Sequence, residues 1–203
     1  MVAIIDYGVG NLFSLASSLK MIGEDAVVTS DPNTIREADS LILPGVGAFE
    51  DAAKKLFSSG LDKVIKEECA KKKPLLGICL GMQMLFEKSH EYGIHDGLAL
   101  IKGEVVSMKG RIPEHLDIPH MGWNALSFKK ESRLFKYINE GDFVYFVHSY
   151  YADNCKESIS ATAEYGKEIT ASVESGNIYG CQFHPEKSGE VGLLILKAFC
   201  EIK

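Results

Sequence analysis

The sequence predicts an α/β fold, a single domain with a mainly parallel central sheet that is flanked by helices and extended by antiparallel strands. Short apolar runs alternate with amphipathic stretches in the first half of the chain, which is typical of parallel strands joined by helical crossovers. The second half is rich in β-type segments separated by short polar turns. No repeat, linker or low-complexity run interrupts residues 1–203, so we expect one domain over the whole chain.

The first half is expected to alternate strands and helices from its start. The strands are short apolar runs, and the helices carry apolar residues at three- and four-residue spacing. The expected strands are Val2–Ile5, Ala26–Thr29, Ser40–Leu43 and Leu75–Ile78. The expected helices are Leu12–Ile22, Ala48–Phe57, Leu61–Lys72 and Met82–Lys88.

The second half is expected to add antiparallel strands to the edge or face of the same sheet, before a helix closes the chain. The expected strands are Leu98–Met108, Trp123–Phe128, Phe143–Tyr151, Ser158–Tyr165, Ile169–Val173 and the apolar run Ile178–His184. The closing helix is expected over Gly192–Ile202.

The composition limits the classes of partner and compartment. The formal net charge of −6 disfavours binding to nucleic acid or to an anionic membrane through bulk charge. The N-terminus lacks the basic start and long apolar run of a signal peptide, so we expect a cytoplasmic protein. The five cysteines are widely spread and include no Cys-x-x-Cys pair, which argues against a disulfide framework and a zinc site. We expect no metal or other cofactor.

The sharpest local signal is the segment Gly77-Ile-Cys-Leu-Gly81, which follows the expected strand Leu75–Ile78 and precedes a helix. A nucleophile with a glycine two residues away on each side, between strand and helix, is the pattern of a nucleophile elbow. Cys79 would then lie at a helix N-terminus, which favours the thiolate, and the Leu80 amide would face an oxyanion. The same residues also fit a buried core cysteine packed between glycines.

A cysteine nucleophile needs a base, and the base needs an orienting group. His184 ends the apolar run Ile178–Phe183, and open α/β sheets place their sites beyond the carboxyl ends of strands. Residues two apart on an extended segment point to the same side, so Glu186 is expected to orient His184. Alone, His184 could simply end a strand. With the elbow present, a Cys79–His184–Glu186 triad is the better explanation.

Two further segments suit a site around Cys79. The turn Pro44-Gly-Val-Gly47 follows an expected strand and could supply a second oxyanion donor, although an ordinary turn has the same composition. Gln83 lies one helical turn after Cys79, where its amide could bind a polar substrate or simply face solvent. Trp123, the single tryptophan, is most simply a core or interface residue, and His148 is most simply an edge residue.

Together these segments resemble the class I glutamine amidotransferases, and among them most closely the glutaminase subunits of imidazole glycerol phosphate synthases. The similarity runs through nearly the whole chain in the family's order. It is carried by Ile4–Asn11, Pro44–Gly47, Gly77–Gln83, Pro119–Asn124, Phe146–Tyr150 and Gln182–Ser188. The elbow and the His-Pro-Glu segment mark the superfamily, whereas the first and fourth of these segments point to the synthase subunits.

The resemblance implies hydrolysis of L-glutamine to glutamate and ammonia through a cysteine thioester. It implies that Cys79 attacks the carboxamide, that His184 transfers protons and that Glu186 orients His184. The oxyanion donors would be the amides of Leu80 and, after a peptide flip, Val46. The positions matching glutamine-binding residues of the family are Gly47, Gln83, Glu91, Ser149 and Tyr150.

The resemblance also implies that Glu91 faces the substrate's α-ammonium group and that the chain has a partner. In the family, ammonia passes, shielded from water, into a (βα)₈-barrel cyclase subunit of a heterodimer. That subunit makes imidazole glycerol phosphate and an aminoimidazole carboxamide ribotide in histidine biosynthesis. The positions matching the interface are Met121, Trp123, Asn124, Tyr145 and Lys187, together with Asn11 beside the oxyanion loop.

Three other interpretations share these motifs. A paralogue could deliver ammonia to a different acceptor, such as a sugar-modifying synthase, with the same catalytic residues. A regulatory protein could retain the fold without activity, but the intact Cys79, His184 and Glu186 argue against it. A cysteine peptidase or another amidase of this fold is disfavoured, because Gln83 and Glu91 together suit a free amino acid.

Overall fold

The computed structural model describes residues 1–202. Its main sheet contains the parallel strands β1 (Val2–Ile5), β2 (Ala26–Thr29), β3 (Ser40–Leu43), β4 (Leu75–Ile78) and β14 (Ile178–Cys181). The antiparallel strands β13 (Glu168–Ser175), β12 (Ile159–Glu164) and β9 (Ser127–Phe128) extend it. The strand order is β2-β1-β3-β4-β14-β13-β12-β9. The predicted fold class, parallel with antiparallel additions, is therefore confirmed.

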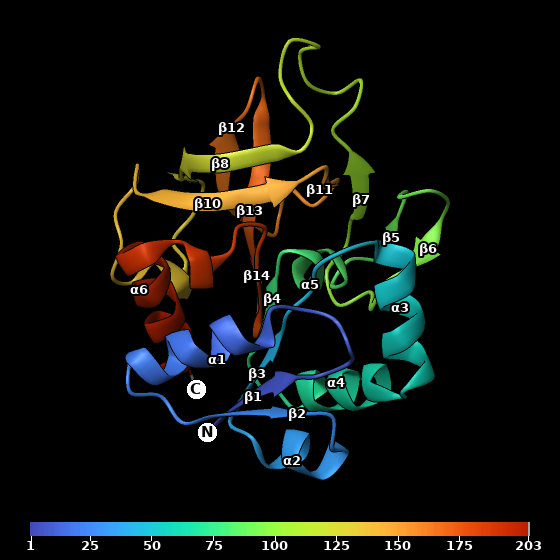
Figure 1. Ribbon diagram of the computed structural model, residues 1–203, viewed down its shortest axis with the longest axis vertical. Coiled ribbons are helices and arrows are strands. Elements are labelled where there is room, and N and C mark those ends of the chain that lie inside the picture. Colours follow the sequence, from blue (N-terminus) through green and yellow to red (C-terminus); the bar gives the residue numbers. More distant parts are fainter. Residues whose placement is uncertain (203) are drawn as a thin grey trace.

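Helices cover both faces of the parallel half of this sheet (Figure 1). One face carries α1 (Leu12–Met21) and α6 (Gly189–Cys200), and the other carries α3 (Phe49–Ser58) and α4 (Leu61–Ala70). Along β1, Ala3 and Ile5 pack in the core beneath α3 and α4, whereas Val2 and Ile4 pack beneath α1 and α6. Because β1, β3, β4 and β14 are buried on both faces, these four strands read as continuous apolar runs rather than as alternating ones. The edge strand β2 is only partly buried.

The remaining strands form two smaller sheets. One is the antiparallel ribbon of β8 (His120–Ala125) and β10 (Phe143–His148), and the other contains β11 (Tyr150–Asp153), β7 (Glu104–Ser107), β5 (Lys88–Ser89) and β6 (His95–Asp96). The strands expected over Leu98–Met108 and Phe143–Tyr151 therefore do not join the main sheet, whereas the segment expected over Trp123–Phe128 reaches it only through β9 at its end. No strand was expected at β5 or β6. The single strand expected over Phe143–Tyr151 is also wrong, because the chain changes partner at Ser149. Residues before Ser149 pair with β8, and residues after it pair with β7.

The helix expected over Met82–Lys88 is wrong for most of its length. Helix α5 spans only Leu80–Gln83, and the following residues turn through the core, where Met84, Leu85 and Phe86 are fully buried. The Met84 carbonyl accepts a hydrogen bond from the Leu98 N–H at 2.7 Å instead of continuing a helix. The strand expected over Leu98–Met108 begins only at Glu104, the first residue of β7. The residues from Leu98 onward bond instead to this buried turn.

Other boundaries differ by a few residues, and one helix was not expected. Helix α2 (Pro32–Glu37) begins with Asp31, whose carboxylate accepts from the Thr34 N–H at 2.9 Å, and with Pro32 in its first turn. Those two residues are an N-terminal signal that the sequence contained. Single-turn 3₁₀ helices occur at η1 (Arg133–Phe135) and η2 (Pro185–Lys187). None of the helices within residues 1–202 has the length and apolar character needed to cross a bilayer.

Candidate active site

Cys79 stands on a strained turn between β4 and α5. Its backbone has φ 54° and ψ −110°, a left-handed φ that is rare for a residue with a side chain. Its N–H donates to the Cys181 carbonyl of β14 at 2.7 Å. A Cβ on Gly81 would collide with the Leu43 carbonyl oxygen, and one on Gly77 would lie 2.7 Å from the Gly81 carbonyl oxygen. Only glycine fits at both positions, and the geometry is that of a nucleophile elbow.

His184 follows β14 and faces both Cys79 and Glu186. Its Nδ1 lies 2.8 Å from Glu186 Oε1, and the two side chains are 2% and 4% exposed. Burial alone would lower the pKa of His184, but hydrogen bonds with Cys79 and Glu186 outweigh it and raise the pKa to about 9. A His184 imidazolium is therefore favoured beside the sulfur and the carboxylate.

Strand β10 holds His184 in place through the backbone. The His184 N–H donates to the Tyr145 carbonyl at 2.9 Å. The Tyr145 N–H donates to Ser188 Oγ at 3.0 Å, and that hydroxyl donates to the His184 carbonyl at 2.6 Å. Strand β10 therefore holds the His184 backbone directly at its N–H and, through the Ser188 hydroxyl, at its carbonyl.

A cavity of about 350 Å³ opens above Cys79 and His184. It gathers residues from segments far apart in the sequence. The predicted oxyanion donors and glutamine contacts that line it are Val46, Leu80, Gly47, Gln83, Glu91, Ser149 and Tyr150. The fold therefore brings these predicted residues to one place, while Glu186 lies behind His184, outside the cavity lining.

Three of these predicted residues, Glu91, Leu80 and Gln83, already hold backbone partners, and Gln83 Nε2 donates to the Tyr150 carbonyl at 3.0 Å. Glu91 Oε2 accepts from the Phe49 N–H at the start of α3 at 2.8 Å, and burial raises the pKa of this half-buried carboxyl. The Leu80 N–H donates to the Gly45 carbonyl at 3.3 Å, so one of the expected oxyanion donors is occupied in this conformation.

Gln182 is a residue of this site to which the sequence analysis assigned no role. Its side chain is fully buried, and its Nε2 lies 3.7 Å from Cys79 Sγ. Glu186 reaches His184 from the 3₁₀ turn η2 rather than from an extended segment. Alternation applied backward along the expected strand from His184 would have placed Gln182, two residues earlier, on the same side. That spacing was the signal that could have identified it.

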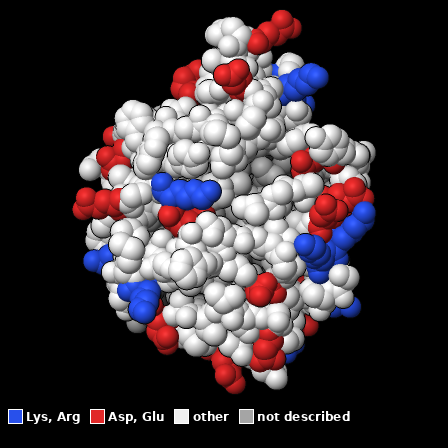
Figure 2. Space-filling view, viewed as in Figure 1, with Lys and Arg blue, Asp and Glu red and all other residues white. Residues whose placement is uncertain are grey.

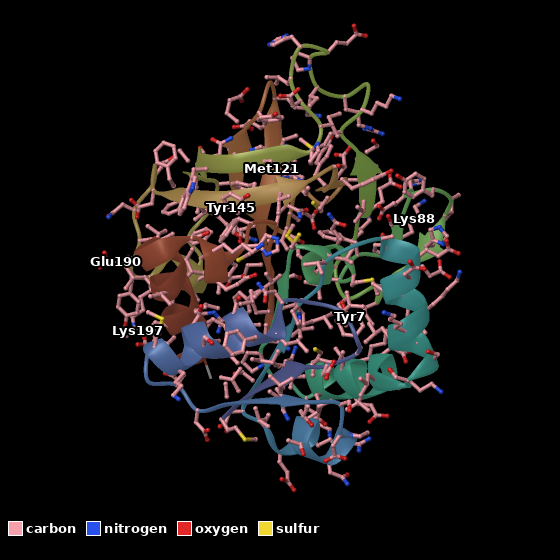
Figure 3. All side chains as sticks on the ribbon, in the orientation of Figure 1. Tyr7, Lys88, Met121, Tyr145, Glu190 and Lys197 are labelled. Atoms are coloured by element: carbon pink, nitrogen blue, oxygen red, sulfur yellow. The ribbon has the colours of Figure 1, made fainter. Side chains whose placement is uncertain are left out.

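The residues predicted at a partner interface divide into two groups. Met121 and Trp123 on β8 are 61% and 55% exposed, and the Trp123 ring meets the Tyr145 ring of β10 edge-on at 6.0 Å. Figure 3 places Met121 and Tyr145 on these paired strands. Lys187 is exposed and lines the cavity.

Asn124 and Asn11 instead make internal contacts. Asn124 Nδ2 donates to the Glu164 carbonyl at 2.7 Å. Asn11 is the N-cap of α1, where its side chain accepts from the Ser14 N–H at 3.5 Å. Both side chains therefore have structural roles within this chain.

Comparisons with known proteins identify the family. The family model described as "Glutamine amidotransferase class-I" matches residues 3–201. The chain belongs to the class I glutamine amidotransferases. It is thus an enzyme of the amidotransferase class, and the interpretation of the chain as a regulatory protein without activity is not supported.

Relatives within this amidotransferase family are similar over the whole chain. A protein of Caldanaerobacter subterraneus subsp. tengcongensis named "Imidazole glycerol phosphate synthase subunit HisH" is 53% identical, with 100% of this chain and 98% of the relative covered. A protein of Bacillus licheniformis with the same name is 50% identical, with 98% and 95% covered. The resemblance stated from the motifs is therefore confirmed, and these relatives are subunits of a larger synthase.

Solved structures show the same amidotransferase fold at much lower identity. A structure described as a glutamine amidotransferase has a TM-score of 0.76 at 16% identity, with 98% of this chain and 100% of that chain covered. The PurLQS structure from Thermotoga maritima has a TM-score of 0.71 at 18% identity, with 98% and 96% covered.

Proposed function

We propose that this chain is the glutaminase subunit of an imidazole glycerol phosphate synthase. In this function it hydrolyses L-glutamine and passes the ammonia to a cyclase subunit. The observation that carries the proposal is the single cavity in which Cys79 and His184 meet every residue matched to glutamine binding. A different acceptor is not favoured, because the full-length relatives carry the synthase name.

The triad accounts for each proton in the reaction. Glu186 accepts the Nδ1–H of His184, and Nε2 of the His184 imidazolium holds the proton that the Cys79 thiol gives up. The thiolate attacks the side-chain carbonyl carbon of glutamine, and His184 protonates the departing nitrogen. Ammonia leaves and a glutamyl thioester remains. His184 then takes a proton from water, the hydroxide attacks the thioester, and Cys79 is reprotonated as glutamate leaves.

The oxyanion loop must move before it can stabilise the tetrahedral intermediate. Rotation of the Gly45–Val46 peptide would withdraw the Gly45 carbonyl from the Leu80 N–H and turn the Val46 N–H toward the oxyanion. The loop is anchored at its start, where the Tyr7 hydroxyl donates to the Pro44 carbonyl at 2.7 Å. It is free at its end, where Gly47 has φ +91° and open space around it.

The substrate's amino-acid end has matching partners at the cavity wall. Glu91 uses one oxygen on the Phe49 N–H, and its other oxygen remains for the α-ammonium group. Ser149 and Tyr150 stand on the opposite segment, where β10 gives way to β11. Because a peptide bond would remove the charge of the α-ammonium group, a site that pairs with this group favours a free amino acid over a peptide.

The partner surface is proposed on the face that carries β8 and β10. Figure 1 shows these strands in front of β12 and β13, and Figure 2 shows that the middle of this face carries few charged side chains. Exposed Met121 and Trp123 suit an apolar interface core. A (βα)₈-barrel cyclase seated there would receive ammonia close to Lys187 and the cavity.

The decisive experiment measures ammonia release from glutamine by the purified chain, alone and with a cyclase subunit plus its nucleotide ligand. Strong stimulation by the liganded partner is expected. Activity without stimulation would point to a different acceptor. Absence of activity in both conditions, with partner binding confirmed, would contradict the glutaminase assignment.

A further inference from the structure

A chain of buried amides leads from a backbone carbonyl to the sulfur of Cys79. Gln83 Nε2 donates to the Tyr150 carbonyl at 3.0 Å and to Gln182 Oε1 at 3.1 Å. Gln182 Nε2 in turn lies 3.7 Å from Cys79 Sγ. Gln182 is fully buried and Gln83 is 5% exposed, so neither amide has an alternative partner in bulk water.

The direction of this chain is determined by its first member. A backbone carbonyl can only accept, so the Gln83 group facing Tyr150 must be its NH₂. The same NH₂ group meets Gln182, whose facing atom must therefore be its oxygen. The Gln182 NH₂ is then left to point at Cys79. Reversing either amide would place two oxygens or two N–H groups against each other.

We propose that Gln182 is a catalytic residue whose side-chain N–H donates to the Cys79 sulfur and stabilises its thiolate, with Gln83 as the positioning residue that holds this donor in place. The proposal rests on the proposed function, in which Cys79 is the nucleophile. It also limits what Gln83 offers to glutamine: both of its N–H groups are used, so only its carbonyl oxygen can contact the substrate, as an acceptor.

A thiolate at this position needs a hydrogen-bond donor because the Cys79 side chain is largely removed from solvent. Cys79 is 7% exposed, and burial disfavours the charged form of a thiol. Cys69 illustrates the effect in the same fold, since burial raises its pKa to about 12. At Cys79, the His184 imidazolium supplies one compensating interaction and the Gln182 amide supplies a second.

The test measures the pH dependence of Cys79 alkylation by iodoacetamide, without glutamine, with the modified peptide identified by mass spectrometry. Gln182→Met removes the donor at similar length, and Gln182→Glu replaces it with a carboxylate. We expect the midpoint of Cys79 alkylation to rise by about one pH unit or more in both variants, with kcat lowered more than KM is raised. Gln83→Met should move the same midpoint in the same direction, because its loss frees the Gln182 amide to turn.

Ser160→Ala is the matched control. It removes a buried hydroxyl of β12 whose partner is Ser172 at 3.0 Å and should leave the midpoint unchanged. A folded Gln182→Met protein with the wild-type midpoint would overturn the proposal. If both Gln182 variants fail to fold, an unshifted Gln83→Met midpoint overturns it instead. Absence of ammonia release by the wild-type chain would contradict the proposed function. The alkylation midpoint does not depend on turnover, so it tests the role of Gln182 separately.

Discussion

Acidification is expected to destabilise the fold through a buried pair of neutral histidines beside the site. His120 Nδ1 lies 3.1 Å from His148 Nε2, and His148 Nδ1 lies 2.8 Å from the Tyr150 carbonyl. Because that carbonyl accepts, Nδ1 of His148 carries its proton and Nε2 accepts from His120. A second proton on His148 would set two N–H groups against each other. Burial lowers the pKa of His120 to about 4 and that of His148 to about 3.

The expected magnitude follows from proton linkage. In the unfolded chain both imidazoles titrate near the ordinary value of 6.5, whereas both stay neutral in the folded chain down to about pH 5. Between about pH 7.5 and about pH 5, each histidine therefore lowers the free energy of unfolding by about 2 kcal/mol, and the pair lowers it by about 4 kcal/mol. His184 offsets part of this loss, because its raised pKa gives a contribution that is fully present only below pH 6.5 and has already fallen at about pH 7.5, on the way to its loss near pH 9. Acidification from about pH 7.5 to about pH 5 restores about 1.4 kcal/mol through His184, which leaves a net expected loss of about 2.5 kcal/mol.

The assay is urea unfolding at both pH values, compared between the wild-type chain and single variants. His120→Gln keeps a donor and an acceptor without titrating, so its pH-dependent loss should be about 2 kcal/mol smaller than that of the wild type, whatever its absolute stability. His115→Gln alters an exposed histidine and should retain the wild-type loss. A wild-type loss below about 1 kcal/mol, or an unchanged loss in His120→Gln, would refute the reasoning.

Three further outcomes are expected. Cys79→Ala should abolish ammonia release from glutamine while partner binding, followed by titration, stays intact; ammonia release by this variant would rule out Cys79 as the nucleophile. Trp123→Ala should weaken stimulation by the cyclase more than it changes folding, and loss of the circular dichroism spectrum would show instead that the indole is core. Gly81→Ala should reduce soluble, folded protein sharply, because its Cβ would collide with the Leu43 carbonyl oxygen; a wild-type unfolding midpoint would contradict the steric argument for the elbow.

Local patterns predicted the parts of this fold that depend on neighbours in the sequence. The parallel strands β1, β3, β4 and β14 were predictable because each is buried on both faces, and the elbow because two glycines must flank the strained Cys79. The segment after Gln83 was not predictable in this way. Its apolar residues fit a helix, but their carbonyls bond to a loop that begins at Leu98. Such long-range competition for backbone partners leaves no periodic signal.

The same limit applies to the change of sheet at Ser149. The segment Phe143–Tyr151 is rich in β-forming residues throughout, yet its two ends line different walls of the site. Before Ser149, the Tyr145 backbone holds His184 and Ser188. After it, the Tyr150 carbonyl orients Gln83 and, through it, Gln182.

This arrangement links the proposed partner surface directly to the catalytic groups. Strand β10 pairs along its whole length with β8, which carries exposed Met121 and Trp123. The ribbon is thereby connected to His184 through the Tyr145 carbonyl and, one strand later, to Gln83 through the Tyr150 carbonyl of β11. Because both acceptors are backbone carbonyls of one continuous segment, side-chain substitutions at Tyr145 and Tyr150 leave both of them in place. We therefore expect a partner that displaces β8 to act on His184 and on Gln83 together.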